Sequence, residues 1–311
     1  MKLRIIFFGS PDFAVSSLEA LIQNGFNVIA VVTTPDKWGG RGNKTLLESD
    51  VKKSALQHHI PILQPEKLSA PSFLDILSEF NPDLQIVVAF KMLPTKVWSL
   101  PRLGTINLHG SLLPKYRGAA PINWAIIRGE KTTGLTTFQL KHEIDTGDIL
   151  MQKEVKIEEN DNFGTVYQKM KVIGAQLLVD TIYSLEKNDF NPISQDNSQA
   201  SSAPKIFHET CIIDFNKTTK EVHDFIRGLS PSPVAWTIIQ GTKYKIYASQ
   251  IQLEMHNIPC GTCIQDKKSL KIACTDGFIQ VLEIQEDARK KMDIQSFVNG
   301  SQLDGKMTES C

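Results

Sequence analysis

The feature that most restricts the fold is a series of short, mostly apolar runs in the first 150 residues. A strand is apolar on both faces where both faces are covered, so such runs are typical of a parallel sheet inside an α/β domain. Between the runs, apolar residues recur at helical spacing, as they do from Ala14 to Ile22. The pattern predicts an α/β fold with a doubly wound, mostly parallel sheet. The runs are Leu3–Phe8, Val28–Thr33, Leu84–Ala89 and Thr105–Leu108.

The rest of the chain divides at a change of composition. Two further strands and a long helix, from about Phe163 to Lys187, complete a first domain over residues 1–187. Residues 188–205 are rich in Asn, Ser, Pro and Gln, which predicts a linker. Residues 206–311 contain one helix followed by short strand-like runs with turn signals between them. That pattern predicts a smaller β-rich domain, either a barrel or a sandwich.

Composition is that of an ordinary globular protein. The 311 residues are 41% hydrophobic and 22% charged, values that favour neither a disordered chain nor a membrane protein. The apolar start "MKLRIIFF" is too short for a signal peptide and is better explained as a buried strand. The formal net charge is zero, so a polyanionic partner would have to be met by a local basic patch.

The five cysteines give little sign of a metal site. Cys260 and Cys263 form one C-x-x-C pair, but no second pair or histidine cluster at zinc spacing accompanies them. We expect no metal, thiols that are incidental to a hairpin or loop, and a location in the reducing cytoplasm.

Two glycine-containing loops fail the tests for nucleotide binding. "FFGSPDFA" has Pro11 where a dinucleotide fingerprint needs its second glycine, and "GGRGNKT" has Asn43 where a Walker loop needs glycine. The second loop, taken with the two residues before it, nevertheless carries Lys37, Trp38, Arg41 and Lys44. It is either a solvated surface loop or a clamp that orders on an anionic partner, since arginine and tryptophan supply phosphate and base contacts.

The pair Asn107 and His109 is the best candidate for chemistry. Residues two apart on a strand share one face, so an amide and an imidazole lie side by side at the end of a buried strand. Together they could stabilise a developing oxyanion. A carboxylate would hold such a histidine charged, and Asp145 is a plausible partner with Asp148 as its rival; a capping aspartate and a structural histidine are the alternative. No serine or cysteine nucleophile stands beside a base, which favours direct transfer to an external nucleophile.

The stretch "INLHGSLLPKYRGAAPINWAI", with "EIDTGDIL" after it, resembles the 10-formyltetrahydrofolate-dependent formyltransferases. Further stretches, "TTPDKWGGRGNK" and "IRGLSPSPVAWT" among them, are most similar to the branch that formylates methionyl initiator tRNA, and the likeness spans nearly the whole chain. It implies 10-formyltetrahydrofolate as formyl donor and direct attack by the methionine amine. Asn107 and His109 would then polarise the formyl oxygen, and Asp145 would hold His109 charged.

The resemblance also implies how the partners are bound. The turn Ser111, Leu112, Leu113 and Pro114 would abut the folate. The pterin pocket would be formed by the segment from Val88 to Pro94, including Phe90, where "VVAFKMLP" departs from the family's commoner "VVAYG". Arg41, with Lys37 and Lys44 beside it, would meet the acceptor stem, and Lys205 would contact tRNA from the linker.

The C-terminal domain would resemble an OB fold that follows the tRNA backbone. Residues 206–311 carry twelve Lys and Arg against thirteen Asp and Glu, so the grip on tRNA would depend on the loop, the linker and local basic clusters. Two other functions stay open, a folate-dependent formyltransferase for a small amine and a nucleic-acid-binding module whose folate site has decayed. Nothing in the sequence requires more than a monomer.

Overall fold

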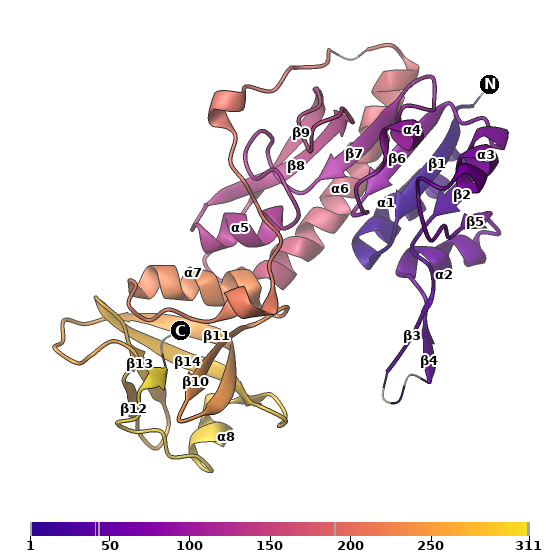
Figure 1. Ribbon diagram of the computed structural model, residues 1–311. Helices are drawn as coiled ribbons and strands as arrows, with labels where there is room; N and C mark the ends of the chain where they lie inside the picture. Colours follow the sequence, from indigo (N-terminus) through magenta and orange to yellow (C-terminus); the bar gives the residue numbers. More distant parts are fainter. Residues whose placement is uncertain (1, 41, 43, 190, 310–311) are drawn as a thin grey trace. The chain divides into compact units, whose positions relative to one another are not determined.

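The computed structural model describes residues 2–40, 42, 44–189 and 191–309 (Figure 1). The chain forms two compact units, and neither is continuous in sequence. The domain boundaries expected at residues 187 and 205 stay a prediction. The first unit comprises Met1–Gly118, Gly134–Val155 and Tyr167–Ser202, and the second comprises Ala119–Thr133, Lys156–Val166 and Ala203–Cys311.

The first unit is built on a seven-stranded sheet with the order β5-β2-β1-β6-β7-β8-β9. Neighbouring strands from β5 to β7 are parallel, and β8 is antiparallel to β7. The chain builds outward from β1 on one side and then on the other, which confirms the doubly wound, mostly parallel sheet. The strands are β1 (Arg4–Gly9), β2 (Asn27–Val32), β5 (Ile62–Leu63), β6 (Leu84–Val88), β7 (Thr105–His109), β8 (Thr132–Gln139) and β9 (Ile149–Lys156).

Burial explains why these runs become strands. The side chains of Ile5, Ile6, Phe7 and Phe8 on β1 are all fully buried, because β1 lies between β2 and β6 with both of its faces covered. Helices connect the strands, and α3 begins at Pro71, a residue that suits the first helical position. The helices are α1 (Asp12–Gln23), α2 (Asp50–Gln57), α3 (Pro71–Glu79), α4 (Thr95–Trp98) and most of α6 (Phe163–Glu186).

A β-hairpin projects from this unit where the sequence suggested a loop (Figure 1). Strands β3 (Lys37–Gly39) and β4 (Thr45–Leu47) pair antiparallel, and Gly40 and Gly42 have φ values of 76° and 74°. Glycine adopts such angles without steric cost, which allows the chain to reverse here. The basic segment is therefore presented on a two-stranded stem.

The second unit is an antiparallel sheet with the order β12-β13-β14-β11-β10-β16, and β15 pairs with β14. A bridge between Thr262 and Met307 joins the β12 edge to the β16 edge, so the sheet curls into a near-barrel. This confirms the smaller β-rich domain and favours the barrel over the sandwich. The strands are β10 (Ala235–Ile239), β11 (Thr242–Leu253), β12 (Cys263–Gln265), β13 (Leu270–Ala273), β14 (Gly277–Glu286), β15 (Met292–Asp293) and β16 (Thr308–Glu309).

Helix α7 (Thr219–Leu229) covers the core of this unit. Thr218 and Glu221 form a capping box at its start, and Val222 and Ile226 point into the core. Gly228 lets α7 approach α5 (Pro121–Ile127), because a Cβ there would lie 2.6 Å from the Ile127 side chain. The unit also contains α8 (Ile294–Val298). Among the described helices of the whole chain, none is long and apolar enough to cross a membrane.

Candidate active site

The carboxyl ends of β6 and β7 lie side by side, since Val88 is paired with Leu108. Asn107 and His109 are two residues apart on β7 and therefore share one face of the strand. Asn107 is half-buried, and within the described residues its side-chain amide makes no hydrogen bond. The strand thus presents one uncommitted amide beside one imidazole.

The imidazole of His109 is held on both sides. Its Nε2 lies 2.8 Å from the carbonyl oxygen of Tyr116, and its Nδ1 lies 3.7 Å from Oδ2 of Asp145. The ring also packs edge to face against Phe138, with 6.4 Å between the ring centroids. Only 6% of the His109 side chain and 12% of the Asp145 side chain are exposed, so this pair is shielded from bulk water.

The turn that carries Asp145 is pressed against the end of β8. A Cβ at Gly147 would lie 1.6 Å from the carbonyl oxygen of Gln139, so this position accepts only glycine. Asp145 itself has a φ of 55°, and its Oδ2 accepts a 2.8 Å hydrogen bond from the backbone N–H of Gly118. The close fit of the turn therefore explains the glycine at position 147.

Asp148, the rival carboxylate, is engaged elsewhere. Its Oδ1 accepts hydrogen bonds from Lys141 Nζ at 2.8 Å and from Ser194 Oγ at 3.1 Å. The hydrogen bond from Lys141 holds the pKa of Asp148 below its usual value. Of the two candidates, Asp145 is the one that faces His109.

The turn from Ser111 to Pro114, predicted to abut folate, is held by hydrogen bonds to Thr136 of β8. The Thr136 hydroxyl donates to the carbonyl of Ser111 at 2.7 Å and accepts from the N–H of Leu113 at 3.1 Å. Gln152 adds a 2.9 Å bond to the carbonyl of Leu113. These backbone groups already have partners, so a ligand would meet the half-buried Leu112 and Pro114 rather than the interior of the turn.

The predicted pterin segment needs one correction. Val88 is fully buried in the sheet, so it offers no surface to a ligand. The surface begins at the exposed Ala89, which has a φ of 47°, and continues at the half-buried Phe90. The ring of Phe90 packs edge to face on Phe8, with 5.8 Å between centroids. Ala89 therefore replaces Val88 as a candidate contact, beside Phe90.

The residues expected to meet tRNA are placed as follows. Lys37 and Lys44 are exposed on the β3–β4 hairpin, beside Trp38, whose exposed fraction is 66%. Arg41 lies outside the described residues. Lys205 is exposed in the second unit, with its Nζ 5.2 Å from the ring centroid of Phe207.

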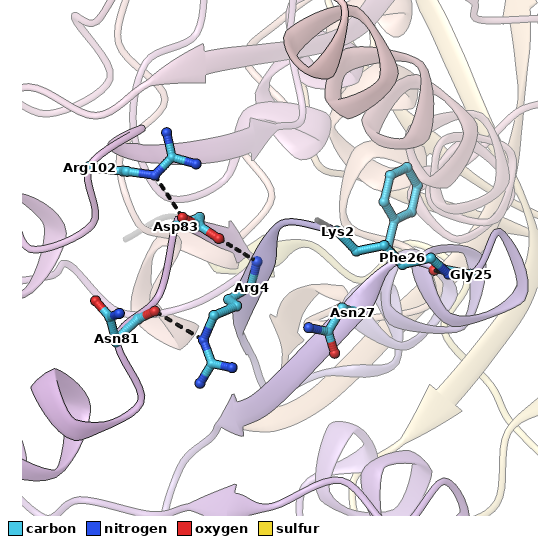
Figure 2. A pocket seen from close by; sticks show the side chains of 8 residues that line it. All are labelled: Lys2, Arg4, Gly25, Phe26, Asn27, Asn81, Asp83 and Arg102. Atoms are coloured by element: carbon cyan, nitrogen blue, oxygen red, sulfur yellow. Dashed lines mark hydrogen bonds and ion pairs between the residues drawn. The ribbon is translucent and has the colours of Figure 1, made fainter.

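A cavity of about 910 Å³ lies at the opposite edge of the sheet, where the parallel strands begin (Figure 2). Asp83 joins its two arginines, accepting from the N–H of Arg4 at 2.8 Å and from Arg102 Nε at 2.7 Å. Lys2 donates to the carbonyl of Gly25 at 2.7 Å. These polar groups therefore already have hydrogen-bond partners within the protein.

The cysteines of the C-x-x-C pair do not form a metal centre with their neighbours. In the described ranges, no group of three or more His, Cys, Asp or Glu side chains could hold a metal ion. Burial raises the pKa of Cys263 and of Cys274 to about 12. These two thiols serve as core residues of the barrel.

Several residues at the site could not be predicted from the sequence. Tyr116 and Gly118 contribute backbone groups, which carry no signal in a sequence. Thr136 points inward from a strand like any buried threonine. Gln195 binds the Asp145 turn from a polar, low-complexity stretch that indicated only a linker.

Comparison with known proteins places the chain in a family. A formyl transferase family model matches residues 1–182, and the model of the formyl transferase C-terminal domain matches residues 205–302. A methionyl-tRNA formyltransferase of Bacteroides thetaiotaomicron is 47% identical over 97% of this chain and 96% of the relative. One of Azobacteroides pseudotrichonymphae is 48% identical over 96% of each chain.

Solved structures share the fold at lower identity. An N-formyltransferase from Helicobacter canadensis, solved with folinic acid and dTDP-3-aminofucose, is 23% identical with a TM-score of 0.66. The sugar 3N-formyl transferase WlaRD, solved with dTDP and 5-N-formyl-THF, is 22% identical with a TM-score of 0.68. Each alignment covers 93% of this chain and 100% of the other.

Proposed function

The chain belongs to the formyl transferase family and, within it, to the methionyl-tRNA formyltransferases, and we propose that it transfers the formyl group of 10-formyltetrahydrofolate to the α-amino group of methionyl initiator tRNA. The observation that carries this proposal is that Asp145 lies 3.7 Å from His109, which shares one face of β7 with Asn107 at the carboxyl end of the strand, in a chain nearly half identical to such enzymes. Ligands of doubly wound sheets bind at this edge.

The reaction needs a donor to the formyl oxygen. The neutral amine attacks the formyl carbon, a C–N bond forms, and the oxygen becomes an oxyanion. The uncommitted amide of Asn107 supplies one hydrogen bond to it. His109 supplies the second from Nδ1, because Nε2 is occupied by the carbonyl of Tyr116. The oxyanion then re-forms the carbonyl, the bond to N10 of the folate breaks, and N10 takes up a proton while the amine loses one.

Asp145 completes the arrangement. Its carboxylate lies 3.7 Å from Nδ1 of His109, where its negative charge would stabilise a cationic ring while the oxyanion forms. Because the pair is largely buried, this charge is little screened by water. In this proposal the same carboxylate accepts the proton that the amine loses.

The two substrates would occupy different surfaces. The folate would lie against Phe90 and the turn from Ser111 to Pro114. The tRNA would be met by the β3–β4 hairpin, through Lys37, Lys44 and Arg41, and by Lys205 with the OB-like unit. We propose no metal, a monomeric enzyme and a cytoplasmic location.

A single-turnover assay tests this function. Enzyme in excess over methionyl initiator tRNA, supplied with 10-formyltetrahydrofolate, should yield formylmethionyl-tRNA. The same enzyme should leave a dTDP-amino sugar and glycinamide ribonucleotide unmodified. Formylation of either small amine without formylation of the tRNA would contradict the proposal and support a small-amine acceptor.

A further inference from the structure

We propose that Gln195, in the polar stretch after α6, is a positioning residue that holds the Asp145 turn against His109. The inference rests on the proposed function, because it assigns Gln195 a part in that reaction through Asp145. It also gives a role in the reaction to the segment 188–205, which the sequence predicted to be only a linker.

Gln195 uses its whole hydrogen-bonding capacity at this one place. Its Nε2 donates to the carbonyl of Asp145 at 2.8 Å and to the carbonyl of Gly147 at 2.7 Å. Its Oε1 accepts from Arg117 Nε at 3.0 Å and from Arg117 Nη2 at 2.6 Å. A carboxamide has two N–H donors and two acceptor lone pairs, so the side chain is saturated.

The two loops that Gln195 joins are the two that fix the catalytic pair. Gly118, next to Arg117, donates to the Asp145 carboxylate, and the carbonyl of Tyr116 accepts from His109. The same stretch grips this loop a second time, since Ser201 Oγ accepts from the N–H of Tyr116 at 2.9 Å. Segment 195–201 therefore binds the partners of both members of the pair.

The geometry of the turn explains why such a brace is needed. Asp145 has a φ of 55°, in the left-handed region that is uncommon for residues other than glycine. Two carbonyls of the turn point at Gln195, and they would repel each other without its donors. Since the Asp145 carboxylate lies 3.7 Å from Nδ1, a shift of the turn changes that distance directly. Displacement of about 1 Å at such a site can cost roughly 100-fold in rate.

The test uses Gln195→Ala and Gln195→Glu in the full chain. Alanine removes all four bonds, whereas glutamate keeps the shape and the interaction with Arg117 but replaces both donors to the carbonyls. We expect single-turnover formylation to slow by about 10- to 100-fold in both variants. The dissociation constants for a folate analogue and for initiator tRNA should stay within about two-fold of wild type, because in the part of the chain that the structure describes the Gln195 side chain binds only Arg117 and the Asp145 turn.

Gln199→Ala is the matched control. Gln199 lies in the same stretch, and among the described residues its side chain binds Asp196 alone, so its removal should leave the rate unchanged. Circular dichroism and the melting temperature check that each variant folds. If the alanine variant does not fold, the isosteric glutamate variant decides the question.

A double variant separates positioning from general stability. In an Asp145→Asn background, where we expect a low rate, adding Gln195→Ala should cost less than two-fold further. An additive effect, or a wild-type rate in Gln195→Glu, would overturn the inference. An Asp145→Asn enzyme with full activity would instead overturn the proposed function, so the two failures can be told apart.

Discussion

Nε2 of His109 lies 2.8 Å from the carbonyl oxygen of Tyr116. A carbonyl can only accept a hydrogen bond, so this ring nitrogen carries a proton and is not a free base. Nδ1 is left as the atom that faces Asp145. If His109 donates to the formyl oxygen as proposed, it does so from Nδ1, where the Asp145 carboxylate lies 3.7 Å away.

Removal of either proposed oxyanion donor should abolish most of the activity without unfolding the protein. In single-turnover assays, His109→Ala and Asn107→Ala should each slow transfer by about 10² to 10³, equivalent to roughly 3–4 kcal/mol of transition-state stabilisation. Calorimetric titration with a folate analogue should give a dissociation constant near that of wild type. A variant that transfers formyl groups within three-fold of the wild-type rate would remove that residue from the mechanism.

The two aspartates of the D-x-G-D stretch offer a matched comparison. Asp145→Asn keeps the shape but removes the charge facing His109, so we expect transfer to slow by at least 10-fold. Asp148→Asn removes only a partner of Lys141 and Ser194, and its rate should match wild type. Equal reductions in the two variants would show that the turn, and not the Asp145 carboxylate, is what the reaction needs.

The sequence predicted the parallel sheet because burial on both faces leaves a direct trace in composition. Leu3–Phe8 and Thr105–Leu108 could be assigned to strands from their apolar runs alone, and they coincide with β1 and β7. Once β7 was assigned as a strand, Asn107 and His109 could be predicted to lie on the same face, because residues two apart on a strand share one face. Spacing alone left Asp148 as a rival to Asp145, and only the family resemblance favoured Asp145, since the difference depends on which carboxylate Lys141 occupies in three dimensions.

The errors have physical causes as well. Val88 ends an apolar run, and nothing in the sequence says that the surface begins only at Ala89. The β3–β4 hairpin was missed because its strands are three residues each and mostly exposed, so neither burial nor periodicity marks them. Gln195 could not be predicted, because a polar segment that binds the domain through its side-chain amides has the same composition as a solvated linker.

If the hairpin meets tRNA, its lysines should contribute to the salt dependence of binding. Removing one phosphate-binding lysine lowers the slope of log K against log salt by about 0.7 to 0.9. We expect Lys37→Ala and Lys44→Ala each to reduce the slope measured by filter binding of initiator tRNA, with binding of folate unchanged. Lys187→Ala, an exposed lysine beyond the end of α6, is the control. An unchanged slope in both hairpin variants would argue against this surface.

The barrel cysteines should react according to their burial. Burial raises the pKa of Cys263 and Cys274 to about 12, so at pH 8 only about one thiol in 10⁴ is the reactive thiolate. Peptide mapping after iodoacetamide treatment should find both unlabelled in the folded protein and labelled in urea. Cys260 is only half-buried and should be labelled more quickly in the folded state. Protection of all three that disappears on adding a chelator would indicate a metal instead.

Asp83 should make the protein more stable at neutral pH than in acid. The N–H of Arg4 and the guanidinium of Arg102 lower the pKa of this carboxyl below its usual 3.8. A depressed pKa contributes stability above the unfolded-state value, and that stability is lost as the pH falls through the folded-state value. Asp83→Asn should therefore melt below wild type at pH 7, and the difference should shrink below about pH 4. Asp75→Asn, on the exposed side of α3, should show no such trend; an equal gap for Asp83→Asn at both pH values would contradict the electrostatic origin.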